Sequence, residues 1–251
     1  MTKFLLFGDA HLETGVEEDP AYNLIKMIVK KEKFEGIVML GDMLDFSYIS
    51  RWTEEFPGLQ EGKRMKEDFE ILESELQFFR KHTKELIYLE GNHELRVMKY
   101  IQKNPVLEGI LDLKEICREN DVKYISTNKQ PYRYLPDLMV THGLSISKYV
   151  AAQIVTSVGE SIVCGHTHRS QNYSYRYPNG NVTTGYSIGT VGTLNPDFIA
   201  GNRVAGWTSS FGVLYVEGTK WQLDTILIKD GESCILGGKV YSLAPKKGAE
   251  Q

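Results

Sequence analysis

The sequence is poor in the features that mark secreted, disulfide-stabilised and membrane proteins. Only three of its 251 residues are cysteines, and their spacing is neither that of a disulfide framework nor that of a thiolate zinc site. No apolar run approaches the length of a membrane span, and the chain enters an apolar strand pattern at residue 4 without a signal-peptide pattern. We therefore expect a soluble, cytoplasmic protein with reduced and mostly buried thiols.

The sequence also lacks a large excess of charge of either sign. Its net charge of -4 argues against a surface devoted to nucleic acid, although a local basic rim around a cleft stays open. With 41% hydrophobic residues the chain can bury a sizeable core. We expect one domain over residues 1–245, with insertions at about 46–62 and 95–120 and a flexible tail at 246–251.

The first half of the chain alternates short apolar runs with amphipathic patterns. The runs lie at 4–7, 37–40 and 86–89, and the helical patterns between them span 20–33 and 63–82. Strand, helix and strand in succession predict right-handed crossovers in a parallel sheet. The region after residue 94 predicts two further helices, the second about a dozen residues long and ending near Asn120.

The second half of the chain changes to short strands joined by turns. Strands are predicted at 122–126, 132–135, 138–140, 161–164, 211–216 and 221–228, around a hairpin turn at 178–181, with a helix at 147–158 and a weaker strand near 234–240. Crossovers early and hairpins late indicate a four-layer αββα sandwich of two mixed β-sheets with helices outside. In such α/β folds, ligands bind at the carboxyl ends of the strands.

Five motifs with polar side chains follow apolar strands and contain or adjoin glycine. They are Gly8-Asp9-Ala10-His11, Gly41-Asp42-Met43-Leu44-Asp45, Gly91-Asn92-His93-Glu94, Thr141-His142-Gly143 and Gly165-His166-Thr167-His168. Five of the six histidines lie in these motifs, and only His82 sits on a charged helix. A lone histidine would more often be a structural or surface residue, but five in equivalent positions indicate a metal site.

The candidate ligands combine carboxylates, imidazoles and an amide oxygen without any thiolate. This mixed set suits manganese, iron, zinc, nickel or cobalt rather than calcium alone. Seven ligands are too many for one ion and suit two. Two ions about 3.5–4 Å apart can stabilise both the attacking and the leaving oxygen of a displacement at phosphorus.

In this order the five motifs resemble those of the calcineurin-like metallophosphoesterase superfamily, over residues 9–168. The resemblance implies a first divalent metal ion held by Asp9, His11, Asp42 and His168, and a second held by Asp42, Asn92, His142 and His166. Asp42 would then bridge the two ions. We expect manganese, with iron, zinc, nickel and cobalt as alternatives.

The resemblance also implies a catalytic role for two side chains that do not bind metal. His93 would donate a proton to the leaving-group oxygen, and Asp45 would orient the His93 ring and raise its basicity. A solvent molecule shared by both ions would attack the phosphorus directly, without a covalent enzyme intermediate. The alternative role for Asp45 is to cap the segment that follows it. Glu94 we expect to start a helix rather than to bind metal.

Two arginines are candidates for substrate binding. Arg96 lies two residues beyond Glu94, and its planar guanidinium could receive a substrate phosphate; a solvated arginine on an exposed helix is an equally weighted alternative. Arg51 and Trp52 could pair and stack with a base or a sugar phosphate. We favour the alternative in which Trp52 packs under a lid.

The sequence therefore predicts a metal-dependent phosphoric ester hydrolase, with phosphodiesters favoured over monoesters. Protein phosphatases of the superfamily carry an arginine and a glycine after the equivalent of Asp45, where this chain has Phe46-Ser47. We expect a small-molecule or nucleotide phosphate ester rather than a protein as substrate; nucleic acid stays open but unsupported, because no basic groove with interleaved aromatics is evident. The alternatives are a phosphomonoesterase or protein phosphatase, and a non-catalytic scaffold on the same fold. A full ligand set argues against the scaffold.

Overall fold

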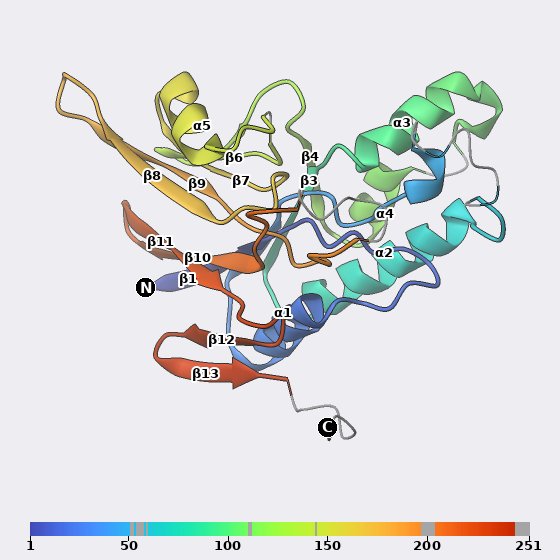
Figure 1. Ribbon diagram of the computed structural model, residues 1–251, viewed down its shortest axis with the longest axis horizontal. Helices are drawn as coiled ribbons and strands as arrows, with labels where there is room; N and C mark the ends of the chain where they lie inside the picture. The colour runs from blue at the N-terminus through green and yellow to red at the C-terminus, as the bar shows by residue number, and fades with distance from the viewer. Residues whose placement is uncertain are drawn as a thin grey trace.

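The fold is built on two β-sheets that lie face to face (Figure 1). The computed structural model describes residues 1–50, 53, 58, 60–109, 112–143, 145–196 and 204–243. The larger sheet has the spatial order β11-β10-β1-β2-β3-β4. Its strands are β1 (Thr2–Phe7), β2 (Gly36–Met39), β3 (Glu85–Glu90), β4 (Lys123–Ser126), β10 (Ser210–Glu217) and β11 (Lys220–Leu227). The first four run parallel to one another, and β10 and β11 add antiparallel pairs.

The smaller sheet has the spatial order β5-β6-β7-β9-β8 and is also mixed. Its strands are β5 (Tyr132–Leu135), β6 (Leu138–Val140), β7 (Ser161–Cys164), β8 (Gln171–Arg176) and β9 (Val182–Ser187). The three central strands β6, β7 and β9 are parallel, and the two edge strands pair antiparallel to them. Both sheets therefore have a parallel centre, which brings the carboxyl ends of neighbouring strands to one edge.

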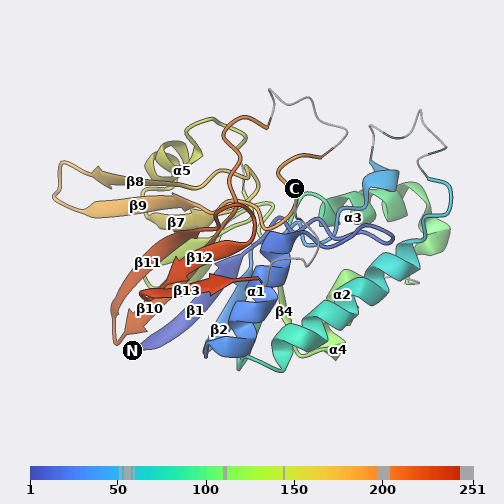
Figure 2. The same ribbon diagram turned by 60° about the horizontal axis from the view of Figure 1, so that its bottom comes forward.

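Helices cover the outer faces of both sheets. They are α1 (Pro20–Lys31), α2 (Met65–Arg80), α3 (Glu94–Lys103), α4 (Leu113–Glu119) and α5 (Val150–Val158), with short 3-10 segments η1 (Ser47–Ile49) and η3 (Pro105–Leu107). Figures 1 and 2 show α5 on the smaller sheet and α1, α2 and α4 beside the larger one. α1 starts at Pro20, where the Asp19 side chain accepts the Ala21 N–H at 2.9 Å. None of the described helices combines the length and apolar character that crossing a membrane requires.

Alternation along β1 shows how the layers are joined. Leu5 and Phe7 are buried with residues of α1 and α2, whereas Leu6 is buried with Val140 and Val163 of the smaller sheet. Both faces of the strand are therefore covered, which explains its continuously apolar sequence. Burial of each such side chain contributes roughly 1.5–3 kcal/mol to stability. The predicted four-layer sandwich of two mixed sheets is confirmed.

Two predicted elements differ in the structure. The single strand predicted near 234–240 is wrong, because β12 (Ser233–Leu236) and β13 (Lys239–Ser242) form a separate hairpin. Gly237 and Gly238 have φ of 57° and 76°, a conformation that glycine adopts without strain, and they form its turn. The helix predicted to end near Asn120 is shorter than expected, because Pro105 starts a 3-10 segment and α4 begins only at Leu113.

The predicted domain limits extend beyond the described residues. The tail at 246–251 and part of the insertion at 46–62 lie outside them. In the other insertion, α4 packs against α2 and β4, so this helix belongs to the helical layer of the larger sheet. The extent of the domain and of its insertions stays a prediction.

Candidate metal centre

All nine residues with a predicted metal or catalytic role lie in loops that follow parallel strands. Asp9 and His11 follow β1, Asp42 and Asp45 follow β2, Asn92 and His93 follow β3, His142 follows β6, and His166 and His168 follow β7. Since these strands belong to two facing sheets, their carboxyl ends meet at one edge of the sandwich. The topology therefore gathers residues that are up to 159 positions apart in the sequence.

The backbone of these loops is strained where the candidate ligands lie. Five of them have a left-handed conformation with φ between 50° and 70°, namely Asp9, His11, Asp42, His166 and His168. Aspartate and histidine tolerate this region better than most residues, yet each such position costs about 1–3 kcal/mol. Strain of this kind is concentrated at functional sites, where the rest of the fold compensates for it.

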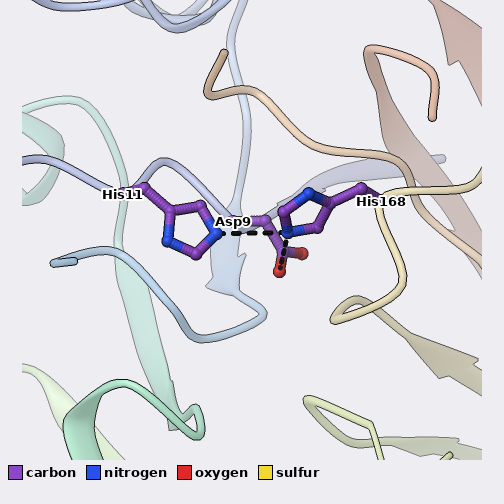
Figure 3. A group of neighbouring side chains, drawn as sticks. All are labelled: Asp9, His11 and His168. Atoms are coloured by element: carbon purple, nitrogen blue, oxygen red, sulfur yellow. Dashed lines mark hydrogen bonds and ion pairs between the residues drawn. The ribbon is translucent and has the colours of Figure 1, made fainter. Parts of the chain in front are cut away.

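The first group of donor atoms comes from two loops, the one after β1 and the one after β7 (Figure 3). His168 Nε2 lies 3.2 Å from Asp9 Oδ1 and 3.1 Å from His11 Nε2. Two imidazole nitrogens at this distance cannot both carry a proton, so at least one presents a lone pair. Asp9 is fully buried, and its carboxylate also accepts the His166 N–H at 3.0 Å. The group thus offers a carboxylate and imidazole nitrogens around one point.

The second group is centred on Asp42 and His142. His142 Nε2 lies 3.3 Å from Asp42 Oδ2 and 3.0 Å from the amide oxygen of Asn92. His142 Nδ1 lies 2.8 Å from the Leu40 carbonyl, which fixes the ring so that Nε2 faces the other donors. One donor atom each from Asp42, His142 and His166 lies within 4.8 Å of the others.

His93 and Asp45 lie next to both groups. Asp45 Oδ1 is 2.7 Å from His93 Nδ1 and 3.5 Å from His11 Nδ1, so one carboxylate faces two imidazole rings. His93 Nε2 then points toward Asp42 Oδ2, at 3.7 Å. η1, the segment that Asp45 could have capped, has no side-chain cap. The geometry therefore favours the orienting role over the capping role.

Glycine is required where the loops approach the carboxylates. A Cβ atom on Gly91 would lie 2.2 Å from Asp42 Oδ1, and one on Gly165 would lie 2.7 Å from Asp9 Oδ2. Both distances are shorter than real Cβ contacts allow. The two glycines let the backbone come close enough to place the next residues, Asn92 and His166, beside the carboxylates.

Both central carboxylates remain ionised in spite of their burial. Burial by itself raises the pKa of Asp42, but the charges of His142 and His93 outweigh it and hold the pKa well below its usual value. Burial also raises the pKa of Asp9, and His168 outweighs it. Burial lowers the pKa of His142, whereas Asp42 raises it, and the net result is a pKa of about 10.

This donor set fits divalent cations. Among the described residues, no lysine or arginine forms an ion pair with Asp9 or Asp42, although their exposed fractions are only 0% and 2%. A buried carboxylate needs a charged partner or a metal ion, because its desolvation is costly. The carboxylates, imidazole nitrogens and amide oxygen lie close enough to bind a borderline divalent metal ion together.

Glu94 has a role that the sequence analysis missed. α3 starts at Glu94 as expected, but the carboxylate turns inward and is fully buried. It accepts the N–H groups of Asp42 at 3.0 Å, Met43 at 2.9 Å and Gly91 at 2.9 Å, and the Tyr88 hydroxyl at 2.7 Å. Glu94 therefore ties the loop after β3 to the loop after β2. Asp42 and Met43 lie 52 and 51 residues away from Glu94, so the local pattern contains no signal for the contact between the two loops.

Arg96 contacts the predicted proton donor. Its Nη2 lies 2.8 Å from His93 Nε2, and its Nη1 donates to the Asp45 carbonyl at 3.0 Å. The side chain is 25% exposed, so it is neither a freely solvated arginine nor a fully enclosed one. Arg51 and Trp52, the other predicted substrate contacts, lie outside the described residues. Phe46 is fully buried against Phe69, with 5.8 Å between ring centroids.

A second residue that the sequence analysis missed is Trp207. Its ring lies against the His168 ring, with a centroid separation of 4.1 Å and an interplanar angle of 63°. Trp207 follows Gly206 in a segment before β10, far from any of the five motifs. A lone tryptophan in a polar segment gave no signal of this contact.

The fold and the donor groups at its edge define a protein of the metallophosphoesterase type. The chain belongs to the calcineurin-like phosphoesterase family, whose model matches residues 2–182. This match confirms the resemblance inferred from the five motifs. No curated protein matches the chain.

Several solved structures are similar to this chain at low sequence identity. Vacuolar protein sorting 29 from Cryptosporidium parvum is 16% identical, with a TM-score of 0.49 over 96% of this chain and 98% of that one. A metallophosphoesterase from Sphaerobacter thermophilus is 14% identical, with a TM-score of 0.46 over 89% and 87%. The nuclease MPE from Pseudomonas putida is 13% identical, with a TM-score of 0.40 over 96% and 87%. Likenesses of this size carry no argument about activity or substrate.

Proposed function

We propose that this chain hydrolyses phosphate esters with the help of two divalent metal ions. One ion would be held by Asp9, His11, Asp42 and His168, and the other by Asp42, Asn92, His142 and His166. The support is the pair of donor groups described above, each with a buried carboxylate that lacks a lysine or arginine partner in the described part of the chain. Bound divalent cations would supply Lewis-acid activation of water and of the phosphoryl oxygens. Manganese stays our first expectation, with iron, zinc, nickel and cobalt as alternatives.

The observation that best supports hydrolysis is the position of the His93 ring. Asp45 holds Nδ1 at 2.7 Å, and Nε2 faces the carboxylate that we propose to be shared by both ions. Burial lowers the pKa of His93, but the charge of Asp42 and the hydrogen bond to Asp45 raise it above its usual value. We propose that His93 donates the Nε2 proton to the departing oxygen and that Asp45 orients the ring.

Arg96 is the proposed contact for the substrate phosphate. Its guanidinium is partly exposed, lies next to His93 Nε2, and can donate two parallel hydrogen bonds to phosphoryl oxygens. When the phosphate draws the guanidinium away, His93 Nε2 becomes free to carry the proton. Among the described arginines, only Arg96 forms a hydrogen bond or ion pair with a predicted site residue, and Phe46 points into the core. A single arginine favours the singly charged phosphodiester over a monoester. We propose a small-molecule or nucleotide ester as substrate.

A cytoplasmic location is part of the proposal. The three cysteines, Cys117, Cys164 and Cys234, are all free and buried. Burial raises the pKa of the Cys117 and Cys164 thiols to about 12 and that of Cys234 to about 11, so all three remain protonated. Such thiols are typical of a reducing compartment.

The test is hydrolysis of bis(p-nitrophenyl) phosphate and p-nitrophenyl phosphate by the manganese-loaded protein. We expect His93→Ala to lower kcat about 10²–10⁴-fold while keeping its metal content, because a general acid contributes on this scale. Arg96→Ala should mainly raise KM, with kcat/KM falling roughly 10-fold or more through the loss of charged hydrogen bonds. His82→Ala is the matched control, because in the described part of the chain the His82 ring interacts with the Phe78 carbonyl and the Phe78 ring, on α2.

Three outcomes would contradict parts of this proposal. A wild type that is inactive on both substrates with manganese, iron, zinc, nickel and cobalt would remove the hydrolase function. Loss of bound metal in His93→Ala would make His93 a ligand rather than a proton donor. A higher kcat/KM on the monoester than on the diester would leave the hydrolase but overturn the phosphodiester preference.

A further inference from the structure

The imidazole rings at the candidate centre are held in different ways. His142 Nδ1 has the Leu40 carbonyl at 2.8 Å, and Asp45 Oδ1 lies 2.7 Å from His93 Nδ1 and 3.5 Å from His11 Nδ1. His168 differs, because its Nδ1 is buried and has no hydrogen-bond partner among the described residues. A histidine that binds metal almost always uses its second ring nitrogen to fix the ring orientation. Something else must therefore orient the His168 ring.

The Trp207 ring is the neighbour that can do so. Its centroid lies 4.1 Å from that of His168, the shortest ring separation in the described part of the chain and below the usual range of about 4.5–7 Å for aromatic pairs. Rings in close edge-to-face contact restrict rotation about the Cβ–Cγ bond. At the same time, His168 Nε2 remains directed at Asp9 and His11 (Figure 3).

Hydrogen bonds hold Trp207 in this position. The Thr208 N–H donates to the His168 carbonyl at 2.8 Å, and the Ser170 N–H donates to Thr208 Oγ1 at 2.8 Å. The Trp207 N–H donates to the Val204 carbonyl at 2.9 Å. The residue after Trp207 is thus joined to the backbone of His168 and of Ser170. These hydrogen bonds fix the backbone of Trp207 relative to that of His168.

We propose that Trp207 is a positioning residue for His168, and that its indole ring replaces the missing hydrogen bond in fixing the ring for metal binding. The inference rests on the proposed metal-dependent function. It concerns a residue beyond position 182, where the family match ends, so it is a feature of this chain outside the part that the family model describes.

The test is a manganese titration of the 251-residue chain, which measures one dissociation constant for the tighter ion and one for the weaker ion. We expect Trp207→Ala to weaken the binding of one ion about 10-fold, the scale at which partners of metal ligands act. Trp207→Phe, which keeps an aromatic ring, should stay within about 3-fold of wild type. Trp221→Phe is the control, because Trp221 lies on β11 and donates to Asp137 away from the centre. If the alanine variant does not fold, Trp207→Leu takes its place, and its manganese affinity should also fall.

The possible results separate this inference from the proposed function. Unchanged manganese affinity in the alanine and leucine variants overturns the positioning role. A raised KM for aryl substrates at unchanged manganese affinity also overturns it, because Trp207 would then contact substrate. A wild type that binds no divalent metal overturns both proposals, whereas a wild type that binds two ions without hydrolytic activity overturns only the function. Weaker binding in Trp207→Ala with rescue by Trp207→Phe supports the inference.

Discussion

The two ends of strand β1 lie beside carboxylates in opposite electrostatic situations. At the amino end, Glu32 accepts the Lys3 ammonium at 2.5 Å, pairs with Lys239 at 3.4 Å and accepts the Tyr241 hydroxyl. These partners join the end of α1 to the start of β1 and to the β12–β13 hairpin. The pKa of Glu32 falls from 4.5 to about 2, and the hydrogen bond from Lys3 is the largest cause.

At the carboxyl end, Asp9 is more deeply buried than Glu32 but has weaker partners. Only imidazoles and backbone N–H groups contact it in the described part of the chain. The Glu32 side chain is 15% exposed, whereas Asp9 is fully buried. A carboxylate whose oxygens are paired with ammonium groups cannot bind a further cation, so Glu32 is structural. Asp9, which is deeply buried without ammonium partners, can bind a metal ion.

Glu94→Gln gives the largest effect on folding that this comparison predicts. Glu94 is fully buried, as Asp9 is. Its partners, however, are N–H and O–H donors that fix the loops around Asp42. An amide would turn an NH₂ group toward these donors. We expect the free energy of unfolding to fall by about 3 kcal/mol, since buried donors lose a charged acceptor. Manganese affinity should fall about 10-fold or more, because the loop that carries Asp42 loses its anchor.

Urea denaturation and manganese titration of the same preparation measure both effects. Glu73→Gln is the control, because Glu73 is exposed on α2 and accepts a hydrogen bond from Gln77 at its surface. Its stability should stay within about 0.5 kcal/mol of wild type. A Glu94→Gln variant with wild-type stability and metal affinity would show that the hydrogen bonds to Glu94 have no influence on the metal centre.

Glu32→Gln gives a smaller effect, confined to stability. We expect a loss of about 1–2 kcal/mol at neutral pH, from hydrogen bonds to a charged group, with unchanged manganese affinity and activity. The pKa of Glu32 is depressed in the folded state, so its contribution is present above pH 4.5 and is lost as the pH falls toward about 2. The difference in Tm between wild type and Glu32→Gln should therefore shrink below pH 4.5. A difference that is constant down to pH 3 would contradict the assignment.

Much of the candidate site could be predicted because its signals are local. Each motif combines an apolar run, a glycine and polar residues, and parallel strands bring such ends together without further information. The i to i+3 spacing of His93 and Arg96 on one helix also anticipates their contact, although the phosphate was the partner expected for Arg96.

Other contacts could not be predicted because both partners are needed to recognise them. The Asp42 and Met43 N–H groups that Glu94 binds come from another loop, and nothing near Glu94 distinguishes this buried contact from an ordinary helix start. Trp207 reaches His168 only through the packing of the segment before β10. The β12–β13 hairpin is a different case, because Gly237-Gly238 is a local turn signal that the prediction placed inside a single strand.

The central claim is that Asp42 is shared by two divalent ions. Native mass spectrometry of the protein loaded with manganese measures it most directly, as the number of ions per folded chain. We predict two ions in wild type and in Glu32→Gln, and at most one in Asp42→Asn, which loses the shared negative charge. A wild type that holds fewer than two ions, or an Asp42→Asn variant that keeps both, would contradict the claim.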